Sequence, residues 1–268
     1  MLVPGQSKHA SKKEKATQNK IFSYETRKTY VKQAKYFVLW CKEKHGCKFL
    51  DECWPYAREY FSELAGSDLS AWTIKTRLSA ITKLSGLSAK DLGVSGIIPA
   101  RKRADVKRSR GEKPSDKNFS EKRNAELVAF CRSTGLRRHE LANLRGTDLI
   151  LDGSGIYVHV RKGKGGRNRM VPVIGDQKNV LDLMQKAGKG KVFDRIPVHA
   201  DIHGYRSDYA CTFYRMYARP IEEISSDELY VCRADQKGKK YDKLAMQKTS
   251  EALGHGRIDV IAQSYLRD

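Results

Sequence analysis

The residues best suited to chemistry lie in four short segments of the second half of the chain. They are the Thr-Gly-Leu-Arg run at 134–137, the glycine-rich tip around Lys164, the His-Gly-Tyr-Arg run at 203–206, and Leu-Gly-His at 253–255 with Tyr265 ten residues beyond the histidine. A phenol is a nucleophile, whereas guanidinium and ammonium groups stabilise negative charge. Each segment alone is weak evidence, because an isolated histidine or arginine is more often structural than catalytic.

Together and in this order, the segments resemble the tyrosine recombinases, the phage integrase family. The resemblance covers about residues 119–268 at the level of motifs and extends more loosely to the N-terminal half. It implies a site-specific DNA recombinase, the integrase or transposase of a mobile element. Such an enzyme cleaves and rejoins DNA through a 3′-phosphotyrosine intermediate and a Holliday junction. A type IB topoisomerase shares this chemistry and is the alternative, although it matches the motifs less well.

The resemblance also implies a role for each residue. Arg137 and Arg206 would clamp the scissile phosphate, and Lys164 would be the general acid, with Lys162 and Arg167 as its competitors. The remaining roles are Tyr265 as the nucleophile, His203 for the tyrosine proton, His255 as a donor to a phosphate oxygen, and Glu140 as the support of the clamp. Glu140 could instead be a surface charge or a simple ion-pair partner of Arg137. No metal or cofactor is implied.

These residue types fit the reaction physically. A free phenol has a pKa of about 10, so its proton must be taken or its oxyanion stabilised. The transition state gathers negative charge on the non-bridging phosphate oxygens. A planar guanidinium group can hold two such oxygens and stays charged. The covalent phosphotyrosine keeps the energy of the broken bond, so rejoining needs no external energy source.

The charge of the whole chain favours a polyanionic partner. Its 268 residues carry 52 Lys and Arg against 31 Asp and Glu, a net charge of +21. Nucleic acid is the leading candidate, because neutralising phosphates releases counterions. An anionic membrane is the other candidate, but the sequence has no long apolar run. We therefore expect double-stranded DNA as the partner and no membrane; the resemblance adds a homotetramer on synapsed DNA. A DNA-binding module without catalysis is disfavoured, because every expected catalytic residue type is present.

The cysteines and the start of the sequence bear on the compartment. None of the six cysteines forms a CxxC pair, so zinc-finger and redox motifs are poorly supported. The first ten residues do not resemble the apolar region of a signal peptide. We expect a reduced, cytoplasmic, DNA-associated protein of a prokaryote.

The first half reads as a small helical bundle. Residues 1–22 form an expected flexible basic arm, and 23–95 an expected helical core-binding domain. Ser23 should cap a helix with Val31, Ala34, Val38 and Cys41 on one stripe. Pro55 should begin a second helix. A third should run from a Ser70 cap to Gly86. Residues 96–118 crowd basic side chains between glycines and prolines and read as a linker.

The second half, 119–268, reads as the catalytic domain of mixed α+β type. Helices are expected near 120–132 and 138–144, and extended runs at 149–151, 156–160 and 169–174. The fold class is thus mainly α with a small antiparallel sheet. Tyrosines at 209 and 217 with Phe213 are spaced four apart, as on the buried face of a helix, and are not expected to be nucleophiles.

Two features depart from the family. An insertion near 220–242 reads as a basic hairpin that either contacts DNA or is a solvated loop. The sequence given ends three residues after Tyr265, where many members of the family carry a further helix or strand, so whether a C-terminal element exchanges between subunits stays open. We expect DNA contacts, in addition to the catalytic residues, from Lys75, Arg77, Arg101, Lys102, Arg103, Arg167, Arg233 and Lys237.

Overall fold

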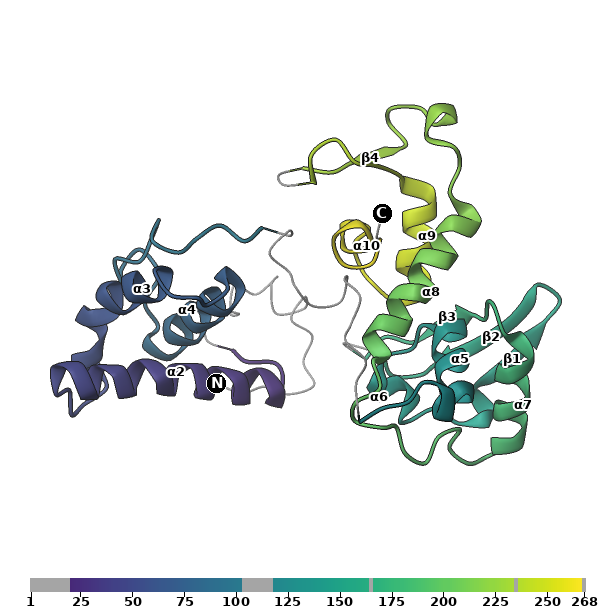
Figure 1. Ribbon diagram of the computed structural model, residues 1–268, viewed down its shortest axis with the longest axis horizontal. Helices are drawn as coiled ribbons and strands as arrows, with labels where there is room; N and C mark the ends of the chain where they lie inside the picture. Colours follow the sequence, from purple (N-terminus) through teal and green to yellow (C-terminus); the bar gives the residue numbers. More distant parts are fainter. Residues whose placement is uncertain (1–19, 103–117, 164–165, 234–235, 267–268) are drawn as a thin grey trace. The chain divides into compact units, whose positions relative to one another are not determined.

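The computed structural model describes residues 20–102, 118–163, 166–233 and 236–266. The chain divides into two compact units, Met1–Asp105 and Val106–Asp268, each with its own hydrophobic core. Figure 1 shows the helical first unit in purple to blue and the mixed second unit in teal to yellow. The fold class predicted from the sequence, mainly α with a small antiparallel sheet, is confirmed. The predicted arm at 1–22 and linker at 96–118 lie largely outside the described residues.

The first unit consists of α-helices α2 (Tyr24–His45), α3 (Ala57–Ala65) and α4 (Ala71–Ser85), with the 3-10 helix η1 (Asp51–Tyr56) before α3. The hydroxyl groups of Ser23 and Ser70 accept hydrogen bonds from the first turns of α2 and α4, as predicted. Gly86 ends α4 in the left-handed conformation, also as predicted. The core gathers aromatic and aliphatic side chains of all three helices, among them Phe37, Tyr60, Phe61, Ile74 and Ile81.

Two details of this unit differ from the prediction. Pro55 lies inside η1, which begins four residues earlier at Asp51, and α3 begins only at Ala57, two residues after the proline. On α2 the buried residues are Ala34, Phe37 and Cys41, whereas Val31 is exposed. The buried face of α2 therefore includes Phe37, whose side chain buries more apolar area than that of a valine.

A three-stranded antiparallel sheet stands at one side of the second unit. Its order is β1 (Leu149–Asp152), β2 (Gly155–Val160) and β3 (Arg169–Pro172). Val158 and Val160 are buried and alternate with more exposed neighbours, the period of two expected for a strand with one covered face. Val158 pairs with Val171 of β3. All three predicted extended runs are present, and β3 carries Arg169 at its start.

Helices make up most of the rest of this unit. They are α5 (Ala125–Thr134), α6 (Arg138–Leu141), α7 (Gln177–Ala187), α8 (Ile202–Tyr217), α9 (Lys243–Leu253) and α10 (Asp259–Ser264), with the short 3-10 helices η3 (Lys122–Asn124), η4 (Gly146–Asp148) and η5 (Ile221–Glu223). In Figure 1 α8 and α9 run side by side, and α5 and α10 lie against them. The predicted helix at 138–144 is shorter than expected and ends at Leu141.

The inserted segment forms the predicted hairpin, β4 (Leu229–Val231) and β5 (Lys240–Asp242). Arg219 fastens it, since its guanidinium pairs with the buried carboxylate of Asp242 at 2.8 Å and with Glu228 at 3.2 Å. Asp242 also caps α9 by accepting from Leu244 N. The hairpin is thus fixed to the start of the helix that ends at the Leu-Gly-His motif.

The aromatic stripe of α8 is buried at Tyr209 and Phe213, as predicted, but Tyr217 is 38% exposed. Within the described parts of the chain, no helix combines the length and the apolar character needed to cross a membrane.

Candidate active site

Arg206 is the centre of the site. Its side chain comes from the second turn of α8, whose first turn is capped by Asp201. The residue is only 1% exposed. Its guanidinium donates to the carbonyl of Gly135, to the carbonyl of Leu253 at 2.6 Å and, through Nε, to the hydroxyl of Tyr265 at 3.1 Å. A buried guanidinium in contact with three separate segments fixes their relative positions.

Gly135 follows α5 in the left-handed conformation, with φ at 57°. A Cβ on this residue would lie 2.5 Å from the ring of Tyr209, so only glycine fits. The close approach lets the Gly135 carbonyl reach Arg206. This explains why the Thr-Gly-x-Arg motif needs its glycine.

Tyr265 is docked in its own chain's site and is 3% exposed. Its hydroxyl lies 3.1 Å from Arg206 Nε and 3.0 Å from His255 Nε2. Ser207 Oγ and Cys211 Sγ donate to its carbonyl from α8, at 3.3 and 3.2 Å. These two backbone anchors were not predicted, because nothing in the sequence shows which carbonyl a serine or cysteine on a helix will meet.

Two histidines lie beside the phenol. The ring centroid of His255 is 5.4 Å from that of Tyr265, and the centroid of His203 is 6.1 Å from it. His203 is exposed in the first turn of α8, and His255 is half-buried directly after α9. His255 Nε2 also lies 3.5 Å from Arg206 Nη2. Both predicted imidazoles therefore stand next to the predicted nucleophile.

Arg137 and Glu140 form a pair at the start of α6. Arg137 Nη1 donates to Glu140 Oε1 at 2.8 Å, and the Arg137 backbone N–H donates to Oε2 at 2.8 Å. Arg137 Nη2 donates to the Leu253 carbonyl at 3.2 Å, the same carbonyl that Arg206 contacts. The side chain of Glu140 is 1% exposed, which excludes the alternative interpretation of Glu140 as a surface charge.

The sequence analysis missed Arg169. Its guanidinium makes two parallel hydrogen bonds to Glu140, at 3.0 and 2.8 Å, and Nε donates to the Ala252 carbonyl at 3.0 Å. Burial acts to raise the pKa of the Glu140 carboxyl, but the hydrogen bonds and charge of Arg169, followed by Arg137, outweigh it and lower the pKa to about 2. The one available signal was its place at the start of a predicted strand.

For Arg206, in contrast to Glu140, the surroundings disfavour the charged form. Burial is the largest cause and lowers the pKa of its guanidinium to about 10, the nearby phenol of Tyr265 opposes this, and the like charge of Arg137 adds to it. The group still carries its charge at neutral pH. A positive group this poorly solvated is a strong site for an anion.

Lys164 lies outside the described residues. The segments on either side of it are described: Gly163 N donates to the Arg167 carbonyl at 2.7 Å, and Gly166 N to the Gly163 carbonyl at 2.9 Å. A Cβ on Gly163 would lie 2.9 Å from Arg169 Nη1. Gly163, the last described residue before Lys164, therefore lies against the Glu140–Arg169 pair.

The predicted DNA contacts have different surroundings. Lys75, Lys102, Arg167, Arg233 and Lys237 are exposed. Arg101 is exposed and lies over the ring of Trp72, whereas Arg103 is outside the described residues. Arg77 donates to Gln33 and to the hydroxyl of Tyr60, so two of its donors serve packing within the first unit. Their roles in DNA binding stay predictions.

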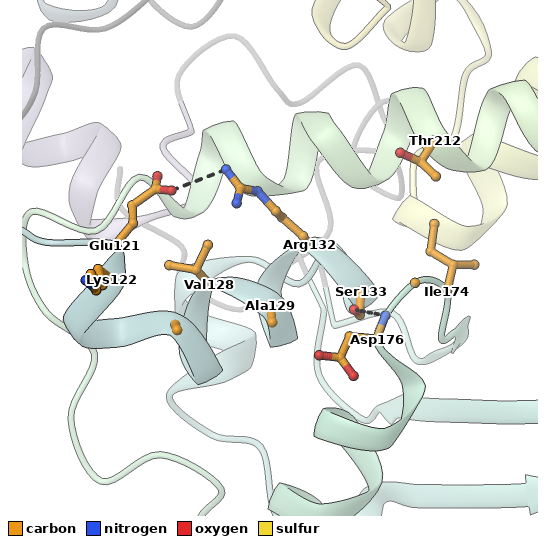
Figure 2. Close-up of a pocket in the computed structure, with 11 residues that line it drawn as sticks. Glu121, Lys122, Val128, Ala129, Arg132, Ser133, Ile174, Asp176 and Thr212 are labelled. Carbon is orange, nitrogen blue, oxygen red and sulfur yellow. Dashed lines mark hydrogen bonds and ion pairs between the residues drawn. The ribbon is translucent and has the colours of Figure 1, made fainter.

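A pocket on the second unit, shown in Figure 2, is separate from these residues. It lies between α5, the turn before α7 and α8, and none of the predicted catalytic residues lines it. Arg132 pairs with Glu121 across it, and Ser133 Oγ accepts from Asp176 N at 3.1 Å. The Ser133–Asp176 hydrogen bond joins the end of α5, just before Gly135, to the turn after β3, and the Arg132–Glu121 pair joins α5 to the segment before η3.

Solved structures share this fold. The chain is similar to the XerH site-specific recombinase bound to a palindromic difH substrate, with 16% identity over 90% of this chain and 76% of that one, and a TM-score of 0.51. It is also similar to the Tn1549 transposon integrase in complex with transposon right-end DNA, with 12% identity over 97% of this chain and 94% of that one, and a TM-score of 0.53. No family model matches the chain, and neither does any curated protein sequence. The chain thus has the fold of the tyrosine recombinases.

The Glu140 pair makes a prediction about stability. We expect Glu140→Gln to lower the free energy of unfolding at pH 7 by about 3 kcal/mol, since it removes one partner of a buried ion pair. The difference from wild type should shrink as the pH falls from 4.5, the ordinary value of the carboxyl, toward about 2, because the wild-type carboxylate is then protonated. Urea unfolding at a series of pH values measures it.

The matched control is Glu222→Gln, which changes an exposed carboxylate of the same unit. It should stay within about 0.5 kcal/mol of wild type at every pH. A Glu140→Gln difference below about 1 kcal/mol, or one that does not change with pH, would contradict the role of the pair.

Proposed function

We propose that the chain is a site-specific DNA recombinase that cleaves and rejoins DNA through Tyr265. The observation that carries the proposal is the docked phenol: within one chain, its hydroxyl lies 3.1 Å from the guanidinium of Arg206 and 3.0 Å from the imidazole of His255. Other tyrosines of the described chain do not have this set of neighbours; Tyr205 and Tyr209, for example, bond to Glu121 and to a backbone carbonyl.

Cleavage begins when a DNA phosphate binds beside the phenol. The donors of Arg206, Arg137 and His255 turn to its non-bridging oxygens and stabilise the charge that develops there. The phenol oxygen forms a bond to phosphorus while the bond to the 5′-bridging oxygen breaks. His203 takes the phenol proton, and Lys164 gives a proton to the leaving 5′-oxygen. The products are a 3′-phosphotyrosine and a free 5′-hydroxyl.

Rejoining reverses these steps with a 5′-hydroxyl of another strand as the nucleophile. Lys164 then takes the proton of that hydroxyl, and the phenol leaves. Two sequential exchanges produce and resolve a Holliday junction. This requires a tetramer on two duplexes, in agreement with a mobile element's integrase or transposase acting on DNA in a prokaryotic cytoplasm.

Two further observations support DNA as the substrate. The net charge of +21 suits a polyanion, and the exposed basic residues occur in both units. The two neighbours with the same fold are described as bound to a difH substrate in a post-cleavage complex and as complexed with transposon right-end DNA. We infer that Arg233 and Lys237 on the β4–β5 hairpin add backbone contacts.

The nucleophile is tested with nicked duplexes of random sequence, because the fragment released beside a nick diffuses away and leaves the adduct trapped. Wild type should form a covalent protein–DNA adduct, and Tyr265→Phe should form none while still binding DNA, since it lacks only the attacking oxygen. Denaturing gels measure the adduct, and sequencing of the trapped strands reports the preferred site.

Tyr217→Phe is the matched control, because Tyr217 lies on the exposed part of α8; it should form the adduct at the wild-type rate. An adduct formed by Tyr265→Phe would refute the proposal. Relaxation of supercoiled plasmid by wild type, without preference for any trapped sequence, would instead identify a type IB topoisomerase.

The general acid is tested with a substrate in which sulfur replaces the 5′-bridging oxygen. Lys164→Ala should slow cleavage of the ordinary phosphodiester by about 10²–10⁴-fold, the usual contribution of a general acid. It should cleave the sulfur substrate close to the wild-type rate, because a thiolate leaves without a proton. Lys162→Ala should show no such selective recovery. Equal slowing of Lys164→Ala on both substrates would remove Lys164 from this role.

A further inference from the structure

We propose that Arg169 is a positioning residue for DNA cleavage. It would hold together the base of the β2–β3 hairpin at Gly163, the arginine clamp (Arg137 with Glu140) and the histidine loop (residues 253–255). The inference rests on the proposed function and deepens it. Arg169 is absent from the motifs that identify the site in the sequence. It lies at the start of β3, directly after the hairpin tip, and its side chain is 9% exposed.

The first connection runs to the clamp. Arg169 holds both oxygens of Glu140 in a fork, at 3.0 and 2.8 Å, and Glu140 in turn holds the guanidinium and the backbone N–H of Arg137. A two-point contact fixes the plane of the carboxylate, and with it the direction in which Arg137 points. A lysine could supply a charge here but not the fork.

The second connection runs to the histidine loop. The last carbonyls of α9 have no partner inside the helix. Arg169 Nε donates to the Ala252 carbonyl at 3.0 Å. The next carbonyl, that of Leu253, accepts from both Arg137 and Arg206. Cations at this end also suit the helix dipole. Leu253, Gly254 and His255 follow Ala252, so Arg169 helps to fix the position of the backbone that carries the His255 imidazole.

Two glycines show how closely the neighbours approach Arg169. A Cβ on Gly254 would lie 2.8 Å from Arg169 Cδ, and one on Gly163 would lie 2.9 Å from Nη1. Gly254 belongs to the histidine loop, and Gly163 to the base of the lysine hairpin. Each motif thus has a glycine where its backbone meets this one side chain, and a displacement of Arg169 displaces both.

A purely structural ion pair would not contact the residues that hold the reacting groups. Arg219 is such a case: it pairs with Asp242 and Glu228 at the inserted hairpin. Arg169 instead bonds to Glu140, which holds Arg137, and to the Ala252 carbonyl just before the histidine loop, and it lies against Gly163 at the base of the β2–β3 hairpin. A shift of about 1 Å in reacting groups can cost about 10²-fold in rate.

The experiment compares full-length Arg169→Lys with Arg219→Lys, measuring folding, DNA affinity and single-turnover adduct formation at saturating DNA. Arg169→Lys should bind DNA with a Kd within about twofold of wild type but form the adduct about 10²-fold more slowly. Arg219→Lys, which loses the fork of a structural pair, should form the adduct at the wild-type rate once DNA is saturating.

A pH profile gives a readout that lost stability would not move. In Arg169→Met, Glu140 stays buried without its main partner, so its pKa rises and adduct formation should fall off at a higher pH than in wild type. The double variant Arg169→Met with Glu140→Gln has no carboxyl to protonate there, so the additional decrease in adduct formation at acidic pH should disappear. It also removes the unpaired charge and guards against misfolding of the single variant.

The inference is overturned if Arg169→Lys forms the adduct at the wild-type rate. It is also overturned if the fraction of unfolded Arg169→Lys accounts for its whole decrease in adduct formation and the pH profile of Arg169→Met equals that of wild type. Both results require that wild type forms the adduct. Absence of the adduct in wild type would refute the proposed function itself, so the two failures are distinct.

Discussion

Three guanidinium groups converge on the carbonyl end of α9, and two of them, those of Arg137 and Arg169, share the carboxylate of Glu140. Arg137, Arg169 and Arg206 carry three positive charges against the single negative charge of Glu140. Burying uncompensated charge is costly. The carbonyls at the end of α9 offset part of that cost through their dipoles, and an anion would offset the rest. The arrangement is therefore favourable for phosphate binding before any DNA arrives.

The rest of the second unit can be understood as the support of this cluster. The glycine turn after α5 brings a carbonyl to Arg206, and β3 brings Arg169. Asp242 caps the start of α9, whose far end receives the three guanidinium groups. Each of these segments comes from a different part of the sequence, so the site exists only in the folded unit. Its rigidity is what lets groups be held in the directions that catalysis needs.

The sequence predicted the elements better than the connections between them. Capping serines, the glycine at the end of α4 and the alternating strands are local signals, and the structure has all of them. The motif residues Arg137, Arg206, His255 and Tyr265 do come together. Arg169 and the anchors of the Tyr265 backbone were missed, because long-range contacts to carbonyls leave no periodic pattern. The predictions for Pro55 and Val31 were wrong because they rested on local preferences, and tertiary packing overrides such preferences.

The docked phenol also predicts which chain supplies the nucleophile in the proposed reaction. Since Tyr265 lies on Arg206 of its own chain, the account requires cleavage in cis. The most direct measurement mixes folded Tyr265→Phe chains with folded Arg206→Lys chains on one DNA and follows the covalent adduct. Every site in the mixture then lacks either its nucleophile or its clamp, so no more adduct should form than with each variant alone. Adduct that appears on the Arg206→Lys chain only after mixing would show that the tyrosine reaches a neighbour's phosphate, and would contradict the account.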